Sequence, residues 1–401
     1  MKRIMSLWIL GTVMSCLFAC NPTPEILVDA TVAIPQASST AAKTTATIPH
    51  ITRTANVLAA ASPTTSNVSN SFPFSERGPY WPGNRVYTFV NESRYGRKIE
   101  VQIYYPALKE ANEQGGTITR NATPDMSGAP YPLILTGSNT GDYIFKSHLA
   151  SYGFVMAIIR SPDPFDTFDY QVMDFPLDSL FALDQIGHDS LEGLEGVIDT
   201  DNTGVTGYSG DGYTSLAVSG IRIDPVFYLS YCERAPVVEP ALSQWYINLF
   251  CSLSGKWDAF VEHVGVEITE SDDGLWQPVT DERIRAVMPM AADGAWFFGE
   301  RGLAMVDLPV LFIQATEDDV NQIIEAAFIF EHLGTPEKFM ISFIGKDHGM
   351  AFETEAANRM KHFAVAFFGY YLQRHEDYAY YFSESFVSQV DDLAWGIYTG
   401  E

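Results

Sequence analysis

The chain has 401 residues, 46% of them hydrophobic, and a formal net charge of −26 at pH 7. So large an excess of acidic residues disfavours nucleic acid as a partner, because the phosphates would repel the protein. It equally disfavours electrostatic docking on anionic lipid. The length suits one large domain with additional segments, and a domain of this size can bury a core without disulfides or metals to hold it together.

The N-terminal segment, residues 1–20, has the pattern of a secretory signal. Two basic residues precede an apolar run, residues 4–19, that is too short to span a bilayer comfortably. Its last four residues, Leu-Phe-Ala-Cys, resemble the bacterial lipobox, in which the cysteine, here Cys20, is acylated and becomes the mature N-terminus. We therefore predict an exported protein that is lipid-anchored to the outer face of a bacterial membrane. Ordinary signal cleavage, giving a secreted protein, is the alternative.

Residues 21–75 differ in composition from the rest of the chain. They are rich in Ala, Thr, Ser and Pro and show no sustained helical or strand periodicity. Such a segment cannot bury enough apolar surface to offset the conformational entropy of the chain. We predict a disordered tether that would hold a folded domain away from a membrane.

Strand and helix patterns alternate from residue 76 to residue 401, which predicts a single α/β domain. The short apolar runs are typical of central strands in a mostly parallel sheet that helices cover on both faces. The first two strands are expected to be antiparallel. Strands are expected at residues 85–90, 98–105, 133–136, 154–159, 204–208, 284–290, 310–315 and 338–344, and helices at 144–152, 175–194, 213–218, 323–333 and 353–371.

The turn around Ser209 connects an expected strand, residues 204–208, to an expected helix, residues 213–218. Ser209 stands between Gly207 and Gly210, so the backbone can turn sharply without clashes from β-carbons. A serine presented in this way is typical of the nucleophile elbow of Ser-His-Asp hydrolases. The alternative is a glycine-rich turn without chemistry.

Residues 221–283 have the texture of an insertion. They contain many aromatic residues, several prolines and the two cysteines that remain after Cys20 is lipidated, Cys232 and Cys251. We predict a cap over the carboxyl edge of the sheet, with its aromatic residues mostly forming ordinary core. In an oxidising compartment the two cysteines are expected to form a disulfide, and two buried free thiols are the alternative.

A base and an acid for Ser209 are expected in two later loops. His348 follows the strand at residues 338–344, in a flexible loop that can direct an imidazole over the sheet. The loop after residues 310–315 contains Asp318, our choice for the acid by spacing, with Glu317 and Asp319 as neighbours. Asp293 is a second candidate. The chain order Ser, Asp, His is that of α/β-hydrolases.

These motifs together resemble the α/β-hydrolase superfamily, and most closely its dienelactone-hydrolase-like and platelet-activating-factor acetylhydrolase-like group. The resemblance runs from residue 78 to the end and is carried by residues 204–214, by residues 309–313 with Asp318, and by residues 345–349. It implies an α/β-hydrolase fold with Ser209, Asp318 and His348 as nucleophile, acid and base.

Two features depart from the family pattern. Asp211 stands where the family usually has a glycine, two residues after the nucleophile. The loop after residues 133–136 reads Thr-Gly-Ser-Asn-Thr-Gly, where the family usually has His-Gly. Backbone N–H groups hold the oxyanion in such enzymes, so Asn139 and Gly210 are expected to supply them here.

The expected function is a serine hydrolase that cleaves carboxylic esters, with short-chain acyl or phospholipid-like acetyl esters as substrates. The mechanism requires no metal and no organic cofactor. Small-molecule or lipid esters are the only partners expected besides the membrane reached by the lipid anchor, and the sequence does not indicate an oligomeric state. Because of Asp211 and the altered loop, a catalytically degenerate, lipid-anchored binding protein is the alternative.

Overall fold

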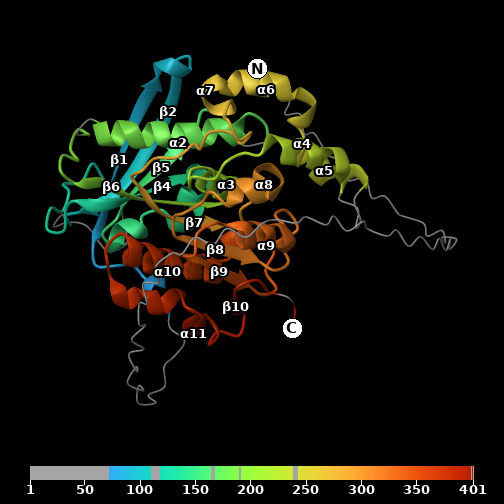
Figure 1. Ribbon diagram of the computed structural model, residues 1–401. Helices are drawn as coiled ribbons and strands as arrows, with labels where there is room; N and C mark the ends of the chain where they lie inside the picture. Colours follow the sequence, from blue (N-terminus) through green and yellow to red (C-terminus); the bar gives the residue numbers. More distant parts are fainter. Residues whose placement is uncertain are drawn as a thin grey trace, which may run out of the picture. The chain divides into compact units, whose positions relative to one another are not determined.

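The computed structural model describes residues 72–109, 118–163, 168–188, 191–237, 243–398 and Gly400. The expected signal segment, Cys20 and nearly all of the expected tether lie outside these residues. The architecture is α/β, with a mostly parallel sheet of ten strands between helices (Figure 1). None of the helices in the described ranges is long and apolar enough to cross a membrane.

The sheet has the order β10-β9-β8-β7-β6-β4-β5-β2-β1-β3. Six neighbouring strands, β9 to β5 in this order, run parallel, whereas β2 pairs antiparallel with β5 and β1, and β10 with β9. The strands are β1 Trp81–Asn91, β2 Arg97–Ala107, β3 Thr119–Arg120, β4 Tyr131–Gly137, β5 Val155–Arg160, β6 Ile198–Tyr208, β7 Ile284–Met290, β8 Val310–Ala315, β9 Lys338–Phe343 and β10 Leu393–Trp395.

Helices cover both faces of this sheet, as strands buried on both sides require. The eleven α-helices of the described ranges are α1 Ser138–Thr140, α2 Gln171–His188, α3 Gly210–Ala217, α4 Pro225–Arg234, α5 Gln244–Phe250, α6 Trp257–Val264, α7 Val266–Thr269, α8 Ala295–Leu303, α9 Ile323–His332, α10 Thr354–Tyr371 and α11 Glu384–Val387. Helix α10 packs on one face of the sheet, while α2, α3, α8 and α9 pack on the other.

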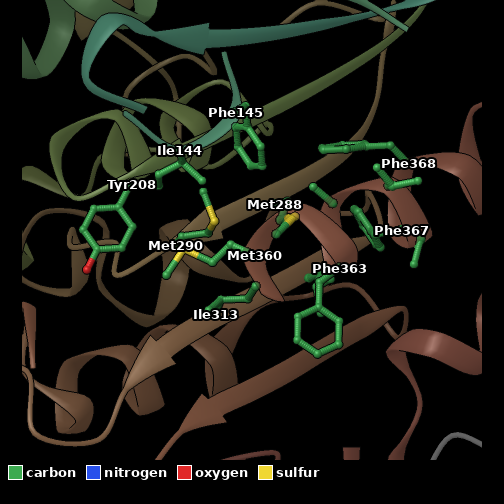
Figure 2. Close-up of a cluster of buried hydrophobic side chains, with 14 of the residues drawn as sticks. Ile144, Phe145, Tyr208, Met288, Met290, Ile313, Met360, Phe363, Phe367 and Phe368 are labelled. Atoms are coloured by element: carbon green, nitrogen blue, oxygen red, sulfur yellow. The ribbon is translucent and has the colours of Figure 1, made fainter. Parts of the chain in front are cut away.

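Helix α10 packs on the sheet through apolar side chains on one of its faces. Met360, Phe363 and Phe367 recur at helical spacing and are fully buried. Figure 2 shows them facing Met288 of β7 and Ile313 of β8, whose side chains point to the same side of the sheet. Apolar side chains from distant parts of the sequence thereby form one core beneath the site described below.

The insertion forms helices α4 to α7, which pack against α8. Its aromatic residues Tyr228, Phe250 and Phe260 are fully buried against one another and against the aromatic residues of α8. They therefore act as core, as the sequence indicated for most of them. Cys232 at the end of α4 and Cys251 after α5 are joined by a disulfide.

The secondary structure differs from the expectations in several places. The helix expected at residues 175–194 is α2, which ends at His188, and strand β3 was not expected. Residues 144–152 do not form one helix: short helical turns at Gly141–Phe145 and Leu149–Tyr152 are separated by Lys146, whose φ of 45° interrupts any helix. Strand β10 was not expected. It is a three-residue strand whose position depends on pairing with β9, and its own sequence carries little signal.

Candidate active site

Ser209 lies in a sharp turn at the carboxyl end of β6. Its φ of 58° and ψ of −121° are conformations that a residue with a β-carbon rarely adopts. A β-carbon on Gly207 would lie 1.9 Å from the carbonyl oxygen of Asp211, so the close approach of the chain requires glycine there. The N–H of Ser209 donates to the carbonyl of Met290 at the end of β7, at 3.0 Å. The turn is therefore held at the edge of the sheet.

The structure brings Ser209, His348 and Asp318 into one chain of hydrogen bonds. Ser209 Oγ lies 3.0 Å from His348 Nε2, and His348 Nδ1 lies 2.9 Å from Asp318 Oδ2. The three side chains come from the loops after β6, β9 and β8, which end at the same edge of the sheet. A serine, an imidazole and a carboxylate in this order can move the serine proton to the imidazole and stabilise the resulting cation.

The carboxylate of Asp318 is fully buried and surrounded by N–H donors. The N–H groups of Val320 and Asn321 donate to Oδ1, at 3.0 and 2.8 Å, and the side chain of Gln314 donates to Oδ2, at 3.3 Å. Such donors compensate a carboxylate for lost water. Both neighbours that the sequence left open, Glu317 and Asp319, are exposed.

Two residues that the sequence analysis did not single out hold these loops in place. The hydroxyl of Tyr208 donates to the backbone carbonyl of His348, at 2.7 Å. The side chain of Asn321 donates to the carbonyl of Ala291, at 2.6 Å, and so connects the Asp318 loop to the end of β7. No local pattern predicts these contacts, because each partner is at least 30 residues away in the sequence.

The second candidate acid, Asp293, lies in a different cluster. It is buried at the start of α8 and accepts a hydrogen bond from the indole of Trp296, at 2.5 Å. Burial, followed by the nearby charge of Glu325, raises the pKa of Asp293 well above its ordinary value. Burial likewise raises the pKa of Glu325 to about 7, and the hydroxyl of Tyr246 donates to that carboxyl. The structure thus places Asp318, and not Asp293, against His348.

The loop expected to hold an oxyanion lies beside the Ser209 turn, in contact with Asp211. The backbone N–H and the hydroxyl of Thr140 both donate to Asp211 Oδ2, each at 2.8 Å. Burial raises the pKa of Asp211, while the bonds from Thr140 and the N–H of Asn139 act in the opposite direction. Gly210, the other expected oxyanion donor, is the first residue of α3, where an N–H has no partner within the helix.

Space for a ligand adjoins this loop. A cavity of about 250 Å³ is lined by side chains that are mostly polar, with Ile159 and Phe175 among them. Two exposed aromatic side chains, Tyr143 and Phe352, pack edge to face with their ring centres 5.5 Å apart. Each follows a candidate site residue, Asn139 or His348, by four positions. Both polar and apolar side chains therefore occur near the candidate site residues in the sequence.

Comparisons with known proteins identify no relative: no family model matches this chain, and no curated protein matches it. Within the described ranges, no group of three or more His, Cys, Asp or Glu side chains is placed to hold a metal ion.

Proposed function

We propose that this protein is a serine hydrolase of carboxylic esters with the α/β-hydrolase fold. The observation that carries the proposal is the hydrogen-bonded chain from Ser209 through His348 to Asp318, with Ser209 in a left-handed turn between strand and helix. The chain order Ser, Asp, His agrees with that superfamily. The sequence resemblance to dienelactone hydrolases and platelet-activating-factor acetylhydrolases supports the same class.

The proposed reaction has two halves. Ser209 Oγ attacks the acyl carbon while His348 Nε2 takes the hydroxyl proton, and Asp318 stabilises the imidazolium. The N–H groups of Gly210 and Asn139 bind the oxyanion of the tetrahedral intermediate. His348 then gives the proton to the departing alcohol oxygen, which leaves an acyl-enzyme. In the second half His348 removes a proton from water, whose oxygen attacks the acyl carbon. His348 then returns this proton to Ser209 Oγ as the bond between Oγ and the acyl carbon breaks, which releases the acid and restores Ser209.

The substrate class that we propose is a small-molecule or lipid ester with a short acyl group. The exposed aromatic pair of Tyr143 and Phe352 offers an apolar surface for part of such an ester. Export and a lipid anchor on Cys20 would present the site to esters outside the cell, at a membrane surface. The proposed hydrolysis of such esters requires no cofactor.

Labelling with a fluorophosphonate tests the nucleophile, because this reagent reacts with an activated serine and not merely with a pocket. We expect the wild-type protein to be labelled and both the Ser209→Ala and His348→Ala variants to remain unlabelled. Ser215, a buried serine of α3 that bonds the carbonyl of Gly212, is the matched control, and its alanine variant should be labelled. Labelling that survives in the Ser209→Ala protein would rule out Ser209 as the nucleophile.

The contact between Asp211 and the oxyanion loop favours one alternative, a binding protein that holds an ester without cleaving it. A carboxylate so close to the proposed oxyanion donors opposes negative charge there. If the well-folded wild type is not labelled but binds a short-chain ester in calorimetry, this alternative replaces the hydrolase.

A further inference from the structure

Asp211 connects the helix that follows Ser209 to the loop that follows β4. Asp211 is 8% exposed, and its carboxylate accepts two hydrogen bonds from Thr140, a residue 71 positions earlier in the chain. A β-carbon on Gly137 would lie 2.0 Å from Asp211 Oδ1, so this glycine leaves the room that the carboxylate occupies. Asp211 therefore connects the first turn of α3 to the separate loop after β4.

Thr140 extends this connection to the residue before Ser209. Its hydroxyl accepts the N–H of Tyr208, at 2.7 Å, and donates its own proton to Asp211 Oδ2, at 2.8 Å. Tyr208, Thr140 and Asp211 thus link the loop to the chain on both sides of Ser209. A glycine at position 211 could make neither of the bonds to Thr140.

Oxyanion donors act because they are already in position when the charge develops, and the loss of one such donor typically lowers kcat by roughly 10²- to 10³-fold. A loop that carries a donor must therefore be fixed relative to the nucleophile. We propose that Asp211 is a positioning residue that fixes the loop of residues 137–140 against Ser209, so that the N–H of Asn139 can bind the oxyanion. This inference rests on the proposed ester hydrolysis.

Because it is charged, Asp211 could also have the opposite role and inhibit the reaction. The two roles predict opposite changes in kcat when Asp211 is removed. The N–H of Asn139 is close enough to the carboxylate to lower its pKa, so Asp211 could instead compete with the oxyanion for that N–H. A competitor would slow the reaction, and removing it would raise kcat. A positioning residue, once removed, lowers kcat.

Steady-state hydrolysis of p-nitrophenyl acetate distinguishes these roles. For Asp211→Ala we expect kcat to fall by roughly 10²- to 10³-fold with little change in KM, because the loss is confined to the transition state. Asp211→Asn should retain most of the activity, since the amide oxygen can accept the same two bonds. Thr140→Val removes the hydroxyl bond to Asp211 but keeps the backbone N–H bond, so kcat should fall in the same direction as in Asp211→Ala. The losses in the double variant should be less than additive, because both substitutions weaken one connection.

Asp142→Ala is the matched control. This carboxylate lies two residues after the loop, in the helical turn Gly141–Phe145, and pairs with Arg160, at 2.7 Å. Its removal should leave kcat close to the wild-type value. An Asp211→Ala enzyme with unchanged or raised kcat would overturn the inference, as would fully additive losses in the double variant.

Hydrogen exchange separates this inference from the proposed function. The amide of Thr140 should be protected in the wild type and exchange faster in Asp211→Ala, while the amide of Met290 in β7 keeps its protection. Absence of esterase activity in the wild type with faster exchange in the variant would refute the hydrolase but retain the structural role of Asp211. Unchanged exchange at Thr140 would refute that role whatever the activity.

Discussion

Ser209 carries backbone strain that only a glycine would relieve. For a residue with a β-carbon, a backbone conformation of φ 58° and ψ −121° costs about 1–3 kcal/mol of folding free energy. Such strain persists where the surrounding structure enforces the conformation. Here the bond from the Ser209 N–H to Met290 and the close contact of Gly207 with Asp211 enforce it. The strain keeps the hydroxyl at the sheet edge, in reach of His348.

We therefore predict opposite effects of Ser209→Gly on stability and on turnover. Glycine adopts this conformation without steric cost, so the free energy of unfolding should rise by about 1 kcal/mol. Ester hydrolysis should be lost with the hydroxyl. Urea unfolding of Ser209→Gly beside Ser209→Ala measures the effect, and equal stability of the two variants would show that the turn is not strained.

The sequence left two candidates for the acid that orients His348, namely Asp318 and Asp293. An amide at position 318 would turn an N–H donor toward His348 and favour the wrong tautomer of the imidazole. We expect Asp318→Asn to lower kcat by roughly 10⁴-fold. Asp293→Asn and the exposed Asp319→Asn should leave kcat little changed. A loss in Asp293→Asn as large as in Asp318→Asn would contradict the geometry.

At the scale of elements, a buried acidic pair joins the insertion to the sheet-covering helices. Asp293 precedes α8, Glu325 lies in α9, and Tyr246 of α5 donates to the Glu325 carboxyl. The hydroxyl of Tyr231 in α4 lies 3.5 Å from the same carboxyl oxygen. The burial that raises both carboxyl pKa values indicates that one proton or more is retained between them.

This pair predicts a pH dependence of stability. The pKa of Glu325 rises from 4.5 to about 7 on folding, so the folded protein binds this proton more tightly than the unfolded chain. Its stabilising contribution is complete below pH 4.5 and is lost as the pH rises through about 7. The wild type should therefore lose stability over this range relative to Glu325→Gln, by on the order of 1–3 kcal/mol.

Urea unfolding at several pH values measures this difference. Comparison with Glu325→Gln removes the contributions of titrating groups that do not interact with Glu325, so the difference belongs to the pair of Glu325 and Asp293. Glu331→Gln, at an exposed position of α9, controls for the substitution itself. Parallel pH profiles for the wild type and Glu325→Gln would mean that Glu325 does not retain its proton on folding.

At the scale of the whole molecule, the parallel sheet gathers the site. Strands β6, β7, β8 and β9 are neighbours and point the same way, so the loops that follow them meet at one edge (Figure 1). Strand β7 contributes no side chain to the hydrogen-bonded chain of the site. The carbonyl groups of Met290, its last residue, and of the following Ala291 nevertheless hold the Ser209 turn and the Asp318 loop. The site depends on strand pairing as much as on its three side chains.

The sequence was sufficient for eight of the ten strands of the described ranges and for a short set of candidate site residues. The expected strands at residues 284–290 and 310–315 coincide with β7 and β8. A fully buried strand is a continuous apolar run, which is a local signal. The glycines around Ser209 are an equally local signal. Asp318 and His348 were candidates because each follows such a strand.

Only the tertiary structure decided which polar groups meet. The sequence could not show that Asp211 faces Thr140, that Asp293 pairs with Glu325, or that Asp318 is the acid against His348. Each contact joins residues at least 30 positions apart. A polar side chain is compatible with solvent, with a cap or with a buried partner, and its own sequence neighbourhood is the same in all three cases. The packing of distant elements decides among them, because burial makes an unpartnered polar group costly.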